Sequence, residues 1–121
     1  MSVYTEIKNT QHLSQILQEN TNIVVIKFGA EWCNPCKYIA PHVQQWIEKF
    51  PQSAKFYIID VDDNFEIYAF FKSKKMLKGI PVLFCYHKGN THFVPDDIVI
   101  GADKAEIDQF FIRSMDALHK P

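Results

Sequence analysis

Cys33 and Cys36 are the residues whose type and spacing most directly indicate chemistry in this chain. They lie in the segment Trp-Cys-Asn-Pro-Cys-Lys, residues 32–37, which follows an apolar run at residues 23–26 and opens a segment with helical periodicity. A strand followed by a helix start would place the pair where unpaired backbone N–H groups and the positive end of the helix dipole favour a thiolate. There a cysteine pKa can fall from about 8.5 to between about 3.5 and 7.5. The pattern therefore predicts thiol–disulfide exchange.

The same two cysteines could instead supply half of a structural zinc site. Cys85, His87 and His92 are the other candidate ligands, and the two histidines have a spacing that zinc sites use. They flank a predicted turn far along the chain from the cysteines, whereas small zinc modules usually close a much shorter loop. Pro35 also suits the start of a helix better than a free-standing metal knuckle. We expect redox chemistry and no metal site, and keep a structural or zinc-bound pair as the alternative.

Length and composition indicate a single globular domain, residues 1–121. The chain has 47% hydrophobic and 14% aromatic residues and a net charge of −1, which fits a well-packed core and argues against nucleic acid as a partner. The first six residues lack the features of a signal peptide, and no apolar run is long enough for a membrane span. Three cysteines fit a catalytic pair and a bystander in a reducing compartment. We therefore expect a cytoplasmic protein without membrane contact.

Hydrophobic periodicity predicts a βαβ unit followed by a β-hairpin and a final helix. Asn9 or Thr10 can cap the first helix, and Pro41 falls inside the helical pattern that follows the cysteines, where it should kink the helix. The expected strands are residues 22–28, 56–61 and 82–86, a second hairpin strand that pairs with 82–86 and ends at residue 100, and a short edge strand at 3–7. The expected helices are residues 10–20, a segment from Cys36 to residue 50, 65–76 and 102–118.

Several segments occur in an order that resembles the thioredoxin family: Phe-Gly-Ala-Glu-Trp-Cys-Asn-Pro-Cys-Lys at 28–37, then Pro41, Gly-Ile-Pro-Val at 79–82 and Gly-Ala at 101–102. The resemblance covers essentially the whole chain. It implies an α/β thioredoxin fold, a central mixed β-sheet of four to five strands flanked by about four helices. It also implies a protein-disulfide oxidoreductase, most simply a monomer that reduces disulfides in partner proteins. Such a protein needs no cofactor and receives electrons from a flavin-dependent thioredoxin reductase.

The resemblance also assigns roles to individual residues. Cys33 would be the exposed nucleophile that attacks a substrate disulfide, and Cys36 the resolving thiol that completes the exchange. Pro81 would be a cis-proline that lies against the active-site disulfide and presents backbone to the substrate. The residues expected to support the site or contact partner proteins are Trp32, Asn34, Pro35, Lys37 and Ile80.

Two residues next to the cysteines depart from the family pattern. Asn34 stands where thioredoxins usually have glycine, and its side chain can donate a hydrogen bond to the Cys33 sulfur. That bond would stabilise the thiolate and make the pair more oxidising, so a disulfide oxidase or isomerase remains an alternative to a reductase. Gly29 replaces a family tryptophan, and we expect this loss of bulk to loosen the structure behind the site.

Lys27 is the largest departure, because it aligns with the buried acidic residue that assists proton transfer at the second cysteine in the family. Ile58 aligns with the lysine that usually faces that acid. Burying an unpaired ammonium group is costly and lowers its pKa. Three placements follow: an ion pair with Asp60 on the face of Ile58, a surface position, or a position that favours a Cys36 thiolate. Lys27 and Asp60 are therefore candidates for proton transfer or pKa modulation.

Overall fold

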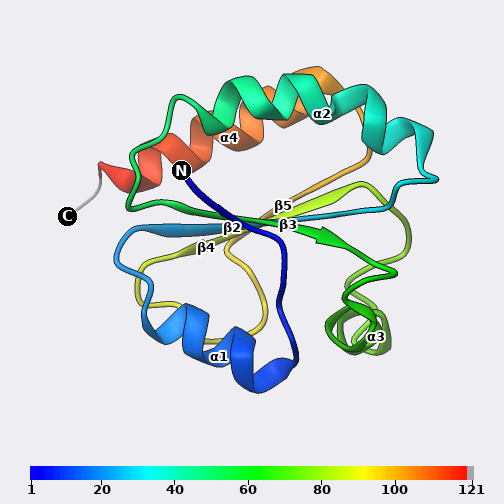
Figure 1. The fold of residues 1–121 in the computed structure, drawn as a ribbon. Coiled ribbons are helices and arrows are strands. Elements are labelled where there is room, and N and C mark those ends of the chain that lie inside the picture. The colour runs from blue at the N-terminus through cyan, green and yellow to red at the C-terminus, as the bar shows by residue number, and fades with distance from the viewer. Residues whose placement is uncertain (120–121) are drawn as a thin grey trace.

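The computed structural model describes residues 1–119, which form a mixed five-stranded sheet with helices on both faces (Figure 1). Helices α2 and α4 cover one face and helices α1 and α3 the other. This is the α/β architecture that the sequence predicts. The strands are β1 (Ser2–Tyr4), β2 (Ile23–Gly29), β3 (Lys55–Asp60), β4 (Val82–His87) and β5 (Asp97–Ile100), and the helices are α1 (Thr10–Gln18), α2 (Asn34–Ile47), α3 (Phe65–Ser73) and α4 (Lys104–Leu118).

Strand β2 lies at the centre of the sheet, whose strand order is β1-β3-β2-β4-β5. It pairs parallel with β3 and antiparallel with β4, while β1 runs parallel to β3 and β5 antiparallel to β4. A central strand covered by helices on both faces must be apolar on both, which explains the near-continuous apolar run at residues 23–28. The carboxyl end of β2 leads directly into the turn that carries the cysteines.

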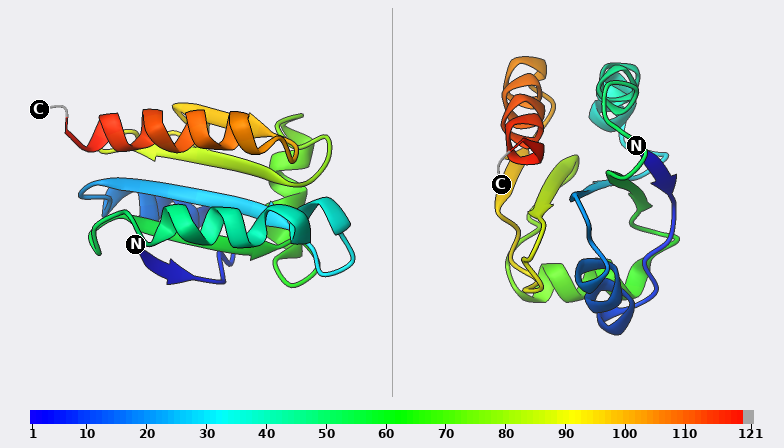
Figure 2. Two further views of the ribbon diagram at one scale, coloured as in Figure 1. Left: turned by 90° about the horizontal axis from the view of Figure 1, so that it is seen from above. Right: turned by 90° about the vertical axis from the view of Figure 1, so that its left-hand side faces the viewer.

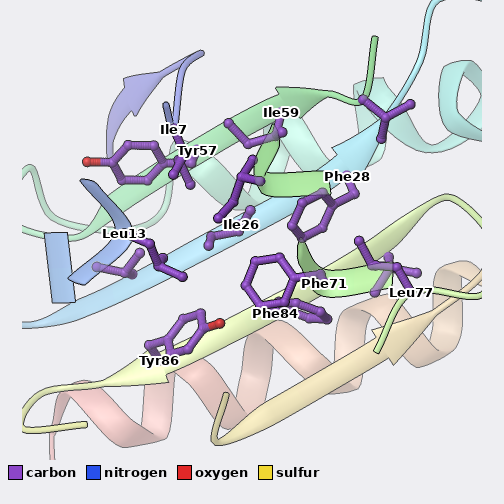
Figure 3. Packing of buried hydrophobic residues seen from close by; sticks show 14 of the residues in the cluster. Ile7, Leu13, Ile26, Phe28, Tyr57, Ile59, Phe71, Leu77, Phe84 and Tyr86 are labelled. Atoms are coloured by element: carbon purple, nitrogen blue, oxygen red, sulfur yellow. The ribbon is translucent and has the colours of Figure 1, made fainter. Parts of the chain in front are cut away.

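The face beneath α1 and α3 holds a cluster of aromatic rings (Figure 3). Phe28 of β2, Phe71 of α3 and Phe84 of β4 contact one another edge to face, with ring centroids 5.2–5.6 Å apart. Edge-to-face contacts of this kind add about 0.5–1.5 kcal/mol each beyond area burial. They tie α3 to the two strands that flank the site.

The opposite face is covered by α2 and α4, which lie side by side (Figure 2). Val25 of β2, Ile39 of α2 and Phe110 of α4 belong to one buried cluster there. Helix α2 runs as one helix across Pro41, so the segments before and after this proline are not separate helices. Within the described residues, no helix is long and apolar enough to span a membrane.

The predicted elements are all present, but several boundaries differ. The expected turn at residues 88–90 is the start of a longer loop, because Asp96 accepts hydrogen bonds from the His87 backbone (2.7 Å) and the Asn90 side chain (3.0 Å). Strand β5 therefore begins only at Asp97. Helix α3 ends at Ser73 rather than Met76, where Lys75 adopts a positive φ of 60° that a helix cannot continue through.

Candidate active site

Cys33 and Cys36 form a disulfide at the N-terminus of α2, with a Cα–Cα distance of 5.3 Å. Cys33 is the N-cap residue, and its sulfur accepts a hydrogen bond from the Cys36 backbone N–H at 3.3 Å. Pro35 lies in the first turn, where its fixed φ suits a helix and its missing N–H costs nothing. The predicted placement of the pair at a helix start is confirmed. On reduction, the same N–H group and the helix dipole would stabilise a Cys33 thiolate.

The Ile80–Pro81 peptide bond is cis, as the resemblance predicts. The carbonyl oxygen of Ile80 lies 4.0 Å from the Cys33 sulfur, although the two residues are far apart in sequence. Pro81 is buried and leads into β4, while Ile80 is half-buried. The loop before β4 thus brings a backbone carbonyl to the edge of the disulfide.

The two cysteines are equally covered, each only 5% exposed. The expectation that Cys33 is the exposed one is therefore wrong for the disulfide form, because Cys33 is held between the helix start and the Ile80 carbonyl. What separates the two sulfurs is their surroundings. A Cβ atom built on Gly29 of β2 would lie 3.4 Å from the Cys36 sulfur, so Cys36 packs against the strand at this position.

Trp32 is 66% exposed and directly precedes Cys33 in the chain. Its indole N–H donates a hydrogen bond of 2.8 Å to the Asp62 carboxylate. Asp62 belongs to the acidic turn after β3, and no sequence signal paired it with the tryptophan. This bond fixes a large aromatic surface next to Cys33. Trp32 also lines a shallow cleft with Glu31, Lys37, Asp60, Asp62 and Asp63.

Asn34 and Lys37 are exposed on the first turn of α2. Across residues 1–119 of the disulfide form, the Asn34 amide makes no hydrogen bond to either sulfur. The bond expected from Asn34 concerns the Cys33 thiolate of the reduced form, so it stays a prediction.

Lys27 is only 8% exposed, on the face of β2 that α2 covers. It lines an open cavity of about 540 Å³ together with Cys36, Gly29 and Asp60. Burial lowers the pKa of Lys27, and desolvation is the cause. The surface placement considered for this lysine is therefore wrong.

The ion pair considered between Lys27 and Asp60 is not formed. The ion pairs among the described residues are those of His42 with Asp108 and of Arg113 with Asp97. Asp60 instead accepts hydrogen bonds from the backbone N–H groups of Asp62 (2.9 Å) and Asp63 (3.3 Å). Its carboxylate closes the turn after β3. Lys27 therefore lines the same cavity as Cys36 and has no ion-pair partner among residues 1–119.

The remaining zinc candidates lie apart from the pair. Cys85 is fully buried in the middle of β4, and burial raises its pKa to about 12, so it is an inert thiol. His87 lies at the end of β4 that is farther from Pro81. In the part of the chain that the structure describes, no three His, Cys, Asp or Glu side chains gather in a group that could hold a metal. The zinc site considered from the sequence is not assembled.

His42 lies six residues after Cys36 on α2 and is half-buried. Its Nε2 lies 2.6 Å from Asp108 of α4, and the Trp46 indole N–H donates to the same carboxylate oxygen at 2.8 Å. These side chains join α2 to α4. The residues that sequence reasoning missed, Asp62 and Asp108, both belong to contacts between distant elements.

Known proteins share this arrangement. The family model described as Thioredoxin matches residues 4–113. Thioredoxin 3 of Plasmodium falciparum is 32% identical over 111 residues, which cover 91% of this chain but only 58% of that relative. Thioredoxin-2 of Saccharomyces cerevisiae is 32% identical over 105 residues, covering 87% of this chain and 92% of the relative.

A solved structure agrees with these sequence matches. The reduced thioredoxin pre-protein of Schistosoma mansoni superposes with a TM-score of 0.72 at 25% identity, covering 93% of this chain and 98% of that one. The matched region includes every strand that positions the site and the helix that carries the disulfide. The chain therefore belongs to the thioredoxin family, and it is a thioredoxin-type disulfide reductase whose thiol–disulfide exchange runs through Cys33 and Cys36.

Proposed function

We propose that this protein reduces disulfides in partner proteins and acts as a monomer in the cytoplasm, with a flavin-dependent thioredoxin reductase as its electron donor. The observation that carries the proposal is the Cys33 sulfur at the N-terminus of α2, where it accepts the Cys36 N–H at 3.3 Å. A sulfur in that position is the better nucleophile of the pair at neutral pH, because the helix stabilises its thiolate.

The reaction has two displacement steps. The Cys33 thiolate attacks one sulfur of the substrate disulfide, and the first substrate cysteine leaves as a thiolate. Cys36 then attacks the Cys33 sulfur of the mixed disulfide and releases the second substrate cysteine. The pair ends as the disulfide that this structure holds, and two electrons from the donor restore it to the dithiol.

Substrate binding is proposed at the surface around Trp32, Ile80 and Pro81. The indole is exposed and held by Asp62, and the Ile80 carbonyl lies 4.0 Å from the Cys33 sulfur. An extended substrate segment could hydrogen-bond the backbone at Ile80 while its disulfide reaches Cys33. Backbone contacts of this kind tolerate many side chains, which suits a reductase of several proteins.

The cytoplasmic assignment is supported by cysteine usage. Cys85 is unpaired and buried, and outside the redox pair the described residues contain no other disulfide. Such usage is typical of proteins from reducing compartments.

Measuring the size of the purified protein at several concentrations tests whether it is a monomer. Measuring the reduction of a protein disulfide at the expense of NADPH, with and without a thioredoxin reductase, tests the proposed electron donor.

The first prediction concerns the reduction potential of the Cys33–Cys36 pair. Equilibration with glutathione buffers, trapping of free thiols and weighing of the products should give a value near about −270 mV, as for a thioredoxin-like reductant. A Cys36→Ser variant is the control, because it forms mixed disulfides but cannot close the internal one. A value of about −180 to −120 mV would identify an oxidase or isomerase instead. Copurified zinc without an internal disulfide would contradict redox function altogether.

A further inference from the structure

Lys27 is a buried amine that the two displacement steps do not use. It is 8% exposed at the centre of the sheet. Its neighbours in register on the flanking strands are Ile58 of β3 and Leu83 of β4, and both are apolar. An ammonium group in such surroundings is destabilised unless a negative charge compensates it. The charge of Lys27 therefore needs a partner that the disulfide form does not supply.

The strand geometry directs Lys27 toward Cys36. Alternate residues of a strand point to the same face, so Val25, Lys27 and position 29 share the face covered by α2. A Cβ atom at position 29 would lie 3.4 Å from the Cys36 sulfur. Residues two apart in a strand are separated by roughly 7 Å, a gap that the four-carbon stem of lysine can bridge. Both side chains line the same cavity (540 Å³).

Other charged groups line this cavity, but none pairs with Lys27. These charged residues come from several segments of the chain that line the cavity. Among residues 1–119, no carboxylate oxygen lies within 4.0 Å of the Lys27 amine, the distance that defines an ion pair. Desolvation lowers the pKa of Lys27, and none of these carboxylates forms an ion pair with its amine. The charged side chains that line the cavity are Glu6, Glu31, Lys37, Asp60 and Asp63.

We propose that Lys27 is the proton acceptor for Cys36, and that the amine and the thiol share one proton during each catalytic cycle. The inference rests on the thiol–disulfide exchange proposed above and names the group that activates its second step. A thiolate on Cys36 is the counter-charge that Lys27 lacks in the disulfide form.

The step balances as follows. In the mixed disulfide, the neutral Lys27 amine takes the proton of the Cys36 thiol and becomes an ammonium group. The Cys36 thiolate attacks the Cys33 sulfur, the Cys33–Cys36 bond forms, and the bond from Cys33 to the substrate sulfur breaks. The substrate cysteine leaves with the electron pair as a thiolate and takes a proton from water. The Lys27 ammonium, now facing an uncharged disulfide, returns its proton to the solvent in the cavity.

A stopped-flow experiment with dithiobis(nitrobenzoate) tests this step, because each displacement releases one coloured thionitrobenzoate. With enough reagent, the first release is complete before Cys36 attacks, and the second release reports that attack. We expect Lys27→Met to raise the Cys36 pKa and shift the pH profile of the second release to higher pH. A rise of one pKa unit cuts the thiolate about tenfold, partly offset by higher nucleophilicity, so the rate at pH 7 falls about threefold.

The matched control is Lys88→Met, which removes the same charge from an exposed loop at the far end of β4. It should leave both releases unchanged. Identical pH profiles for the wild type and Lys27→Met overturn the inference. Absence of a second release from the wild type overturns the proposed function instead, so the two failures are distinguishable. Cys85 does not interfere, because it is buried.

A second measurement uses only the wild-type protein and does not depend on the folding of a variant. The Cε chemical shift of Lys27 in carbon-labelled protein, followed against pH, reports its protonation in the disulfide and dithiol forms. We expect the Lys27 pKa to be higher in the dithiol form, where the Cys36 thiolate compensates the ammonium charge. Equal pKa values in the two forms, or an ordinary value of about 10.4 in both, overturn the inference.

Discussion

At Cys33, backbone groups provide the stabilisation that the chemistry needs. The sulfur caps α2 and accepts the Cys36 N–H, so the reduced thiolate gains a hydrogen bond and the field of the helix without any charged side chain. The neighbouring Asn34 can add a side-chain donor at the same sulfur. Groups within one turn of helix therefore contribute to the reduction potential of the pair.

Asn34→Gly should make the reduction potential of the pair more negative. The variant loses the donor that favours the reduced, thiolate-bearing form. A hydrogen bond has a net value of about 0.5–1.5 kcal/mol, and 30 mV corresponds to about 1.4 kcal/mol for two electrons, so we expect a shift of about 10–30 mV. Glutathione equilibration measures it. An unchanged potential would mean that the amide makes no contact with the thiolate.

Lys27→Met should stabilise the disulfide form at neutral pH, because it removes a buried amine whose pKa is lowered by desolvation in the folded state. Each unit by which burial lowers the Lys27 pKa costs the folded state about 1.4 kcal/mol. The unfolded chain binds the proton more tightly, so wild-type stability rises as pH increases from the lowered pKa toward about 10.4. The advantage of the variant should vanish above that range. Urea unfolding at several pH values checks this, and a variant less stable than wild type at neutral pH would contradict it.

At the scale of elements, α2 must be held in place for the disulfide to meet the loop before β4. Its N-terminal half packs on β2 through Cys36 and Ile39, and its second half is tied to α4 by a polar group. Asp108 accepts hydrogen bonds from the Trp46 indole and from His42. The Trp46 bond, followed by the His42 contact, lowers the pKa of Asp108.

Asp108→Ala should destabilise the protein by about 1 kcal/mol, the usual net value of such a hydrogen bond, without altering the Cys33–Cys36 potential. The folded-state pKa of Asp108 is lowered, so its contribution is complete above the unfolded value of about 3.9 and is lost as pH falls through the folded value. The difference between variant and wild type should therefore shrink in acid. Asp116→Ala, an exposed position on the same helix, is the control in urea unfolding, and equal effects of the two variants would contradict the assigned role of Asp108.

At the scale of the whole molecule, the site is assembled from three segments at one end of the sheet. The end of β2 and the start of α2 carry the cysteines, the turn after β3 supplies Asp62, and the loop before β4 supplies the Ile80 carbonyl. The aromatic cluster of Phe28, Phe71 and Phe84 holds β2, α3 and β4 together beneath them (Figure 3). Core packing on one face thus fixes the positions of loops that are distant in sequence.

The sequence by itself determined the features that depend on local spacing. The apolar run of residues 23–28 required a central strand, and Cys33 with Pro35 required a helix start at the pair, because capping and periodicity act within a few residues. The thioredoxin resemblance added the fold and the cis bond at Pro81, which periodicity alone would not indicate.

Only the tertiary structure decided which distant side chains meet. Lys27 had three possible placements, and the choice depended on the Asp60 carboxylate being used by the backbone of its own turn. The bonds from Trp32 to Asp62 and from Trp46 to Asp108, and the equal covering of the two cysteines, also arise between separate elements. Local patterns cannot determine such contacts, because side-chain direction and competing partners are set only when the elements pack together.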